Sequence, residues 1–217
     1  MPTKLEELEA EIKRLKAQVA DCARMKDYIE IWKLQSLYSH LYSMFRTSEI
    51  PDLFAQKTPG VTLELEDSGV YEGIEGVKKM FCLTLSEKNM RRPGIHAVHM
   101  TVNPIIEINK NGTRARGVWH SHGTVTLAHE GPLKAFWGAG KYDMEYVKED
   151  GKWKFLKLAY RLIYMTPFDK GWVEEPEGSS MARPTDYPPD KPTTWYRPYG
   201  RHRENIFQPP PPEPYKD

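Results

Sequence analysis

The chain has 217 residues, with 31 lysines and arginines against 30 aspartates and glutamates, which leaves a formal net charge of +1. That length fits one ordinary domain with appendages, or at most two small ones. The balanced charge gives no electrostatic reason to expect nucleic acid or an anionic membrane as a partner. The apolar runs are far shorter than a membrane span and the first sixteen residues are charged, so we expect no membrane segment and no signal peptide.

The cysteine and aromatic contents narrow the class of protein further. Cys22 and Cys82 lie in unrelated contexts, and such sparse usage is typical of free thiols in a reducing compartment, so we expect a cytoplasmic location. The 6 tryptophans, 12 tyrosines and 7 phenylalanines suit a core, an interface or a pocket for a flat ligand. Composition alone does not choose among these three.

Residues 1–26 have the pattern of a helical arm. Thr3 and Glu6 have capping-box spacing, which predicts a helix start. Five apolar residues then follow the alternating three- and four-residue spacing of a heptad seam: Leu5, Leu8, Ile12, Leu15 and Val19. This seam pairs with another helix in a coiled coil or packs against the chain's own domain, and its length does not distinguish the two.

A second helical stretch, Asp27 to Arg46, carries the broad apolar face of a core helix. Tyr38 and Tyr42 stand four residues apart, so both hydroxyls emerge on one side of it. The alternation of Val61 to Glu66 then predicts a strand, and Ile74 to Ser86 returns to helical spacing.

From Ile95 onward the pattern predicts a run of strands. Asn111-Gly112 and Asp150-Gly151 are two-residue hairpin signals between alternating segments, and a break at residues 129–132 supplies a third turn. The expected result is a four-stranded antiparallel meander preceded by helices. This is an α+β layout in which helices pack on one face of the sheet.

The composition changes at about Thr166. Prolines dominate the remainder and alternate with aromatic residues, so this segment cannot build a sheet and tends to polyproline II. Disordered tails are poor in aromatic residues, so we expect much of it to lie along the domain or a neighbouring subunit, with the last ten residues loose. We therefore divide the chain into a helical arm at 1–26, a domain at 27–165 and a proline- and aromatic-rich tail at 166–217.

The strand residues carry a family resemblance. HMTVNPIIEI, followed by a turn and then GKYDMEYVKEDGKWKF, resembles the SnoaL-like branch of the NTF2-like superfamily. Members of that branch have a His-x-x-x-Asn-Pro-x-Ile strand, then Gly-x-Tyr, a strand, Asp-Gly and Trp. Tyr38 stands fifteen residues before Leu53-Phe54, as in the family, and VYEGIEGVKKMF matches its Gly-x-x-Gly lead into a helix. The resemblance runs from about Tyr28 to Tyr164.

The resemblance implies an α+β cone, in which a curved antiparallel sheet wraps around a long helix and leaves a pocket between them. Members include polyketide cyclases, scytalone and bile-acid dehydratases, a cofactor-free diarylpropane formaldehyde lyase of lignin breakdown, and non-catalytic binding modules. The fold therefore does not fix the function. Several of these enzymes pair the strand histidine with an aspartate five residues after the helix tyrosine, but this chain has Ser43 there. Their dyad is not available from that helix position.

On the first meander strand, His99 occupies the functional position of the family. It shares the odd-numbered face with Thr101 and Asn103, and we take this polar face as the pocket face. Neither face is charged, so we expect the other to be covered by another subunit or the tail. The alternative is a structural histidine bonded to a neighbour.

His120 and His122 point to the same side of the next strand. Histidines at this spacing occur in metal sites, but no carboxylate follows until Glu130, beyond the turn. We therefore expect no metal, and assign His122 to acid/base chemistry and His120 to substrate hydrogen bonding.

Arg161 lies in the last strand among apolar residues, where it must pair, stack or face water. It would hold a phenolate or an oxyanion, or else form a structural ion pair. Tyr38 is the candidate for protonating a leaving hydroxyl, and Tyr42 is the candidate for packing against an aromatic ring of the substrate. The alternative for both is ordinary core packing. The candidate substrate-binding set is completed by Phe45, Trp119 and Tyr142, each with the same alternative.

These residues lead to an enzyme hypothesis, a cofactor-free lyase that acts on a hydroxylated aromatic small molecule. A para-phenol can expel a benzylic hydroxyl to give a quinone methide, and loss of a proton or of formaldehyde then restores the aromatic ring. The aromatic composition and the missing dyad aspartate favour the diarylpropane-lyase type. The alternatives are a dehydratase or cyclase of a polycyclic or polyketide substrate and a non-catalytic small-molecule-binding module. We expect a homo-oligomer, a dimer or trimer, without a cofactor.

Overall fold

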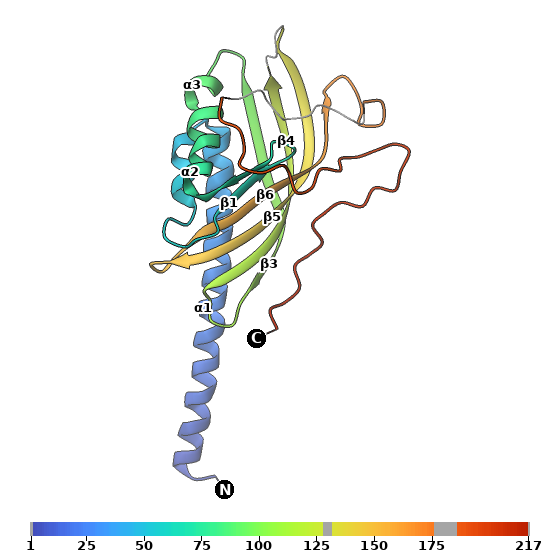
Figure 1. Cartoon of the computed structure of the whole chain (residues 1–217). Coiled ribbons are helices and arrows are strands. Elements are labelled where there is room, and N and C mark those ends of the chain that lie inside the picture. The colour runs from blue at the N-terminus through green and yellow to red at the C-terminus, as the bar shows by residue number, and fades with distance from the viewer. Residues whose placement is uncertain (1, 128–131, 176–185, 217) are drawn as a thin grey trace.

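A computed structural model describes residues 2–127, 132–175 and 186–216 of the chain (Figure 1). Its first element is one uninterrupted helix, α1 (Lys4–Ser43), which joins the expected arm to the expected core helix. The predicted capping box is present, because Thr3 and Glu6 each accept a hydrogen bond from the other's backbone amide. The first half of α1 projects away from the rest of the molecule, and its second half lies in the domain.

Short helices connect α1 to the sheet. The 3-10 helix η1 (Thr47–Leu53) comes soon after α1, and α2 (Gly73–Lys78) runs into the π-helical segment η2 (Lys79–Thr84). A last short helix is α3 (Glu87–Met90). The helical spacing of residues 74–86 thus predicted α2 and η2, but not the wider turns of η2. Within the described residues, no helix is long and apolar enough to cross a membrane.

Six strands form one sheet in the order β2-β1-β6-β5-β4-β3. Two short strands, β1 (Thr62–Leu65) and β2 (Val70–Glu72), pair antiparallel, and β1 pairs in parallel with β6. The predicted antiparallel meander consists of β3 (His96–Ile108), β4 (Arg114–Leu127), β5 (Lys134–Glu149) and β6 (Lys152–Pro167). The predicted α+β class is therefore confirmed.

Two hairpin turns have the geometry that the sequence predicts. Asp150 and Gly151, between β5 and β6, both have positive φ, 47° and 74°, as a type I′ turn requires. Gly112 has a φ of 63° in the turn between β3 and β4. The third predicted turn, at 129–132, falls mostly on residues outside the described part of the chain.

The sheet register sorts the strand residues onto two faces. Two neighbouring rows across β4, β5 and β6 are Trp119-Tyr142-Tyr160 and His120-Lys141-Arg161. The first row faces α1, because the ring of Tyr142 packs at 5.9 Å from that of Tyr38. Side chains alternate along a strand, so the second row lies on the outer face. The core lies between α1 and the inner face.

A bulge interrupts β3. Its pairing with β4 shifts between Val102 and Ile105, and Asn103, between them, has a φ of 51°. Asn103 is exposed, so it leaves the face that we expected it to share with His99. The predicted alternation is wrong at this position, because a bulge moves side chains off the regular two-residue pattern.

The tail lies along the outer face of the same chain, as the red segment of Figure 1 shows. It contacts β2, β6, β5 and β4 in turn through four pairs: Val70 with Lys191, Ile163 with Tyr199, Lys141 with Pro209, and Arg116 with Tyr215. The last two pairs fall in the final ten residues, which we expected to be loose. For residues 186–216, the expectation that the tail lies along the domain is therefore met.

Candidate active site

A cavity of about 370 Å³ lies between α1, the sheet and the tail. Its lining residues are Tyr38, Tyr42, Leu65, Glu66, Ser68, Tyr71, Met80, Thr84, Leu85, His99, Tyr142, Tyr160, Pro188 and Pro189. The described wall thus has five tyrosines, one histidine and one carboxylate, and it includes no lysine or arginine. A volume of this size holds a small organic molecule.

His99 reaches the cavity from β3, as the sequence predicted. Its ring lies 4.8 Å from the ring of Tyr42 and 6.1 Å from that of Tyr160. Burial disfavours the imidazolium and lowers the pKa of His99 to about 4. At neutral pH the ring is therefore uncharged and able to accept a proton. Ser43 accepts a hydrogen bond from the backbone amide of His99 at 3.3 Å, so it holds the strand and not the imidazole.

Tyr38 and Tyr142 form a hydroxyl pair on the cavity wall. Both side chains are buried, and their hydroxyls are hydrogen-bonded to each other. Whichever hydroxyl accepts this bond keeps its own hydrogen to donate to another acceptor. Burial raises the pKa of both phenols well above the ordinary value, so both stay protonated and act as donors rather than bases.

Glu66 brings a carboxylate to the cavity that the sequence analysis missed. It follows β1 directly, has a φ of 55° and is 7% exposed. A positive φ is uncommon outside glycine, and such strained positions cluster at functional sites. The pKa of Tyr160 is raised by burial and then by the charge of Glu66, which indicates that the two groups are close. No sequence signal separates Glu66 from Glu64, two residues earlier.

A smaller cavity of about 50 Å³ adjoins the first. The two cavities share four lining residues, Tyr42, Glu66, His99 and Tyr160. The imidazole and the carboxylate therefore both lie at the junction between a larger and a smaller space. Two groups that can take up or release a proton therefore come together at this junction.

Gly140 makes room for Tyr160 on the sheet. A Cβ atom at Gly140 would lie 2.4 Å from the Tyr160 ring, closer than real Cβ contacts allow. That ring in turn lies 4.8 Å from the ring of Tyr142. The glycine of β5 is therefore explained by close packing, which lets a bulky phenol lie across the neighbouring strand.

Pro188 and Pro189 form one side of the cavity, and a buried ion pair fixes the tail a few residues further on. Arg161 Nη1 lies 2.7 Å from Glu64 Oε1, with side-chain exposures of 9% and 5%. The Thr194 hydroxyl and amide also donate to Glu64, at 2.7 and 2.6 Å. Burial acts to raise the pKa of Glu64, but the bonds from Arg161 and the tail outweigh it and lower that pKa to about 2.

Arg161 thus forms a structural ion pair and is not part of the candidate active site. Its guanidinium lies on the outer face, where it also donates to the Thr194 hydroxyl at 2.9 Å, and it lines neither cavity. This corrects the expectation that Arg161 holds a phenolate. The physical reason is the alternation of β6, which places Arg161 on the face opposite to Tyr160.

His120 and His122 share one strand face, as predicted, but that face is the outer one. Gly123 is the residue that pairs with His99 on the inner face, while the His122 ring lies 5.9 Å from that of Trp137. This corrects the acid/base and substrate-binding assignments, because one step along a strand reverses the face. Among the described residues, no three His, Cys, Asp or Glu side chains gather in a position to hold a metal ion.

Trp119 and Phe45 belong to the core rather than to the cavity wall. Trp119 is fully buried and donates from Nε1 to the Tyr146 hydroxyl at 2.8 Å. Phe45 packs against the core just after the end of α1. Of the predicted substrate-binding residues, Tyr42 and Tyr142 are the two that line the cavity.

The wall combines groups with distinct chemical capacities. A neutral imidazole and a carboxylate can exchange protons with a bound molecule, and tyrosine hydroxyls can donate to an oxygen on which negative charge develops. The remaining surface is aromatic and aliphatic, which suits a flat, largely apolar ligand.

Known structures share this fold. The hexachlorocyclohexane dehydrochlorinase LinA-type3 from Novosphingobium barchaimii is 20% identical, with a TM-score of 0.58 over 70% of this chain and 96% of its own. A candidate scytalone dehydratase from Novosphingobium aromaticivorans is 21% identical, with a TM-score of 0.55 over 71% and 93%. An NTF2-like protein with a cystatin-like fold from the same species is 14% identical, with a TM-score of 0.52 over 76% and 97%. At these identities the likeness shows the fold alone.

A protein-family model identifies the family of this chain. A search of curated proteins gave no match. The sequence model of the SnoaL-like domain matches residues 23–159, more than half of the chain, and that span contains Tyr38, Glu66 and His99. The chain therefore belongs to the SnoaL-like domain family, as its strand motif around His99 predicted.

Proposed function

We propose that this chain is a cofactor-independent lyase that eliminates a leaving group from a hydroxylated aromatic small molecule by acid/base catalysis. The observation that carries the proposal is that His99 and Glu66 both lie at the junction of two cavities with an aromatic wall. An imidazole that is neutral at pH 7 supplies a base, and the carboxylate supplies a second proton-transfer group. An elimination needs no more than these groups and a donor for the developing charge.

Each group has a role in the proposed reaction. His99 accepts the proton that the substrate loses, and Tyr142 donates a hydrogen bond to the oxygen that becomes negative. Tyr38, which lines the cavity and is hydrogen-bonded to Tyr142, keeps the role of protonating the leaving hydroxyl.

A para-phenol substrate would itself take the place of a cofactor. Ionisation of the phenol, whose proton His99 accepts, expels a benzylic hydroxyl, which takes a proton from Tyr38 and leaves as water, and gives a quinone methide. Loss of a proton or of formaldehyde from the adjacent carbon then restores the aromatic ring. Because no cation lines the described cavity walls, tyrosine hydroxyls would stabilise the phenolate in place of Arg161.

The similar structures are consistent with this reaction class. Two of them are named as a dehydratase and a dehydrochlorinase, and both names describe eliminations. The release of formaldehyde is the finer version of the proposal. It is favoured by the aromatic cavity and by Ser43, which stands where the dyad aspartate of several dehydratases is expected.

The test is turnover of a panel of 4-hydroxyphenyl propanols and diarylpropanes with a benzylic hydroxyl, each compared with its 4-methoxy analogue. The proposal predicts turnover of the free phenols only, because a methyl ether cannot form a neutral quinone methide. A new conjugated double bond is followed by absorbance, and released formaldehyde by a colorimetric assay. Loss of water alone identifies a dehydratase, and release of formaldehyde identifies a deformylating lyase.

A non-catalytic binding module makes the opposite prediction. Phenols and methyl ethers would then both bind in calorimetric titrations, and neither would be converted on long incubation. That result would overturn the enzymatic proposal. Stoichiometric zinc or iron in the purified, active protein would overturn its cofactor independence.

A further inference from the structure

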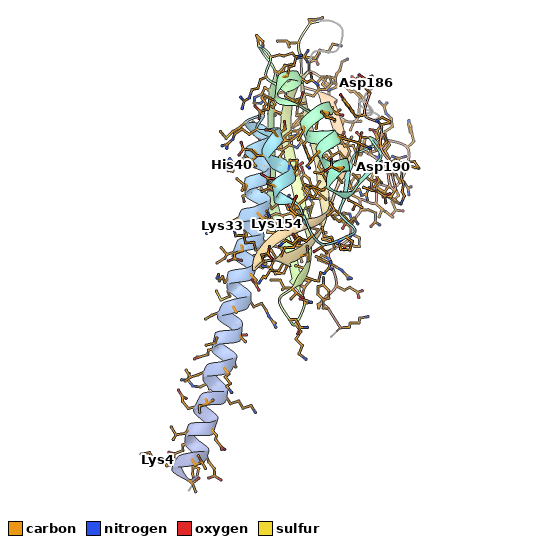
Figure 2. The ribbon with its side chains drawn as sticks, turned by 60° about the vertical axis from the view of Figure 1, so that its left-hand side comes forward. Lys4, Lys33, His40, Lys154, Asp186 and Asp190 are labelled. Carbon is orange, nitrogen blue, oxygen red and sulfur yellow. The ribbon has the colours of Figure 1, made fainter. Side chains whose placement is uncertain are left out.

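The N-terminal half of α1 has no partner within the described chain. Every residue from 2 to 26 is exposed, and α1 enters the domain at Asp27, which is bonded to Lys148 and Trp153. Figure 2 shows the side chains near the labelled Lys4 standing clear of the domain. At about 1.5 Å per residue, the free segment of residues 4–26 extends about 35 Å. Most of the stability of helices in proteins comes from the packing of an amphipathic face.

One face of this free segment is apolar. The five residues of the heptad seam are between 46% and 68% exposed, and Cys22 continues their spacing. In heptad notation, Leu5, Ile12 and Val19 fall on position a, and Leu8 and Leu15 on position d. Two of the three a positions thus carry β-branched residues, and such residues at a with leucine at d favour a parallel pair of helices over larger assemblies.

The seam faces away from the domain. Ile29, which continues the seam spacing, is 50% exposed, whereas Ile31 is fully buried against the core. At about 100° per residue, the part of the seam nearest the domain, Cys22 and Ile29, is roughly 160° or more around the helix from the core-facing Ile31 and Tyr38. Two arms can therefore meet seam to seam while their domains lie on the outer sides.

The charges beside the seam fit a parallel pair in register. In such a pair, position g of one helix faces position e of the other, five residues further along. Lys4 then faces Glu9 of the partner subunit, and Glu11 faces Lys16 of the partner subunit. Both contacts are attractive. The pair of Glu11 with Arg14 on the same helix is exposed and contributes little against them.

From the exposed seam, its direction and its charges, we infer that two copies of this chain dimerise through a parallel, in-register coiled coil of their arms, residues 4–26. The occupant of the seam is thus a second copy of the same chain. This inference is independent of the proposed chemistry, because the arm contributes no residue to either cavity.

The first test uses sedimentation velocity on the full chain at micromolar concentration. The wild type is expected to be a dimer, and the double variant Leu8→Asp, Leu15→Asp a monomer, with the dissociation constant raised more than about 100-fold. The matched control is Ala10→Asp, Ala17→Asp, which introduces the same two charges at the same spacing on the opposite side of the helix. This control is expected to remain a dimer. Near-ultraviolet circular dichroism checks that the domain stays folded in all three proteins.

A charge exchange tests the orientation. Glu11→Lys places two lysines opposite each other in the parallel pair and is expected to raise the dissociation constant about 2- to 5-fold at low salt. The double variant Glu11→Lys, Lys16→Glu restores opposite charges and is expected to return it to the wild-type value. Failure of the second change to rescue the first contradicts the parallel register.

Cys22 reports the register directly, because position d residues of a parallel pair face each other. In a Cys82→Ser background, mild oxidation is expected to give a disulfide-linked dimer through Cys22. In the control, Cys22→Ser with Arg24→Cys moves the thiol to the outer side, and crosslinking should be at least several-fold slower. A monomeric or trimeric wild type, equal behaviour of the two aspartate variants, or equal crosslinking of the two thiols would each overturn the inference.

Discussion

Two phenol rings, those of Tyr42 and Tyr160, lie against the imidazole of His99 on the inner face of β3. Their burial removes water from the imidazole and makes its charged form unfavourable, which is why its pKa falls to about 4. The unfolded chain has the ordinary value near 6.5 and takes up this proton first as the pH falls. The neutral ring therefore favours folding fully above pH 6.5, and this contribution is lost between pH 6.5 and 4.

This titration is directly measurable. We expect one of the seven histidines to stay neutral down to about pH 4 in a nuclear magnetic resonance titration of the imidazole protons. His99→Gln should remove that resonance and no other. A midpoint near 6.5 for the resonance that disappears would contradict the enclosed position of His99.

A second residue-scale prediction concerns Gly140. In Gly140→Ala the new methyl group would meet the Tyr160 ring at 2.4 Å, so the ring must leave its place in the cavity wall. We expect a loss of about 1–3 kcal/mol in the free energy of unfolding, as for other overpacked sites, together with reduced turnover. Gly171→Ala is the control, because nothing lies within 4 Å of its added carbon. Equal stability and turnover in the two variants would refute the packing role of Gly140.

At the scale of the element, strand alternation decides which polar side chains belong to the site. Tyr160 and Arg161 are neighbours in β6, yet one lines the cavity and the other binds Glu64 on the outer face. The ion pair of Arg161 with Glu64 also binds the tail, because Glu64 accepts hydrogen bonds from Thr194. It therefore fixes the tail near the prolines that close the cavity.

Removal of Arg161 tests this role. Arg161→Ala leaves Glu64 buried without its cation, and we expect a loss of about 3–5 kcal/mol in the free energy of unfolding by urea. The tail should also become more accessible to limited proteolysis. Lys157→Ala, in the same strand, removes a more exposed pair with Asp143 and should cost no more than about 1 kcal/mol. Similar losses in the free energy of unfolding would show that the pair of Arg161 with Glu64 stabilises the fold no more than the more exposed pair of Lys157 with Asp143.

At the level of the fold, the sequence predicted the long helix, β1, the four-stranded meander and the pocket-facing strand, but not β2 or α3. Hydrophobic spacing predicted the meander and the second half of α1, and the motif around His99 predicted the family. These features depend on local patterns, which are visible in a single sequence. The same patterns could not locate the end of the arm, because α1 continues through it without a break.

The residues that the sequence analysis missed depend on long-range geometry. Glu66 enters the cavity through a positive φ after β1, and Pro188 and Pro189 enter it from more than a hundred residues further along the chain. Neither placement follows from local spacing. The outer position of His122 was also missed, because the pairing of β3 with β4 that sets its face was unknown.

We propose that His99 performs proton transfer in the enclosed cavity, and a comparison of three proteins tests this role. The turnover rate of His99→Gln is measured beside that of the wild type and of His122→Gln on the outer face, using whichever phenol of the panel is converted. We expect kcat to fall at least about 100-fold for His99→Gln while ligand binding and folding persist, and His122→Gln to keep nearly full activity. Undiminished turnover by a folded His99→Gln protein would contradict this role of His99.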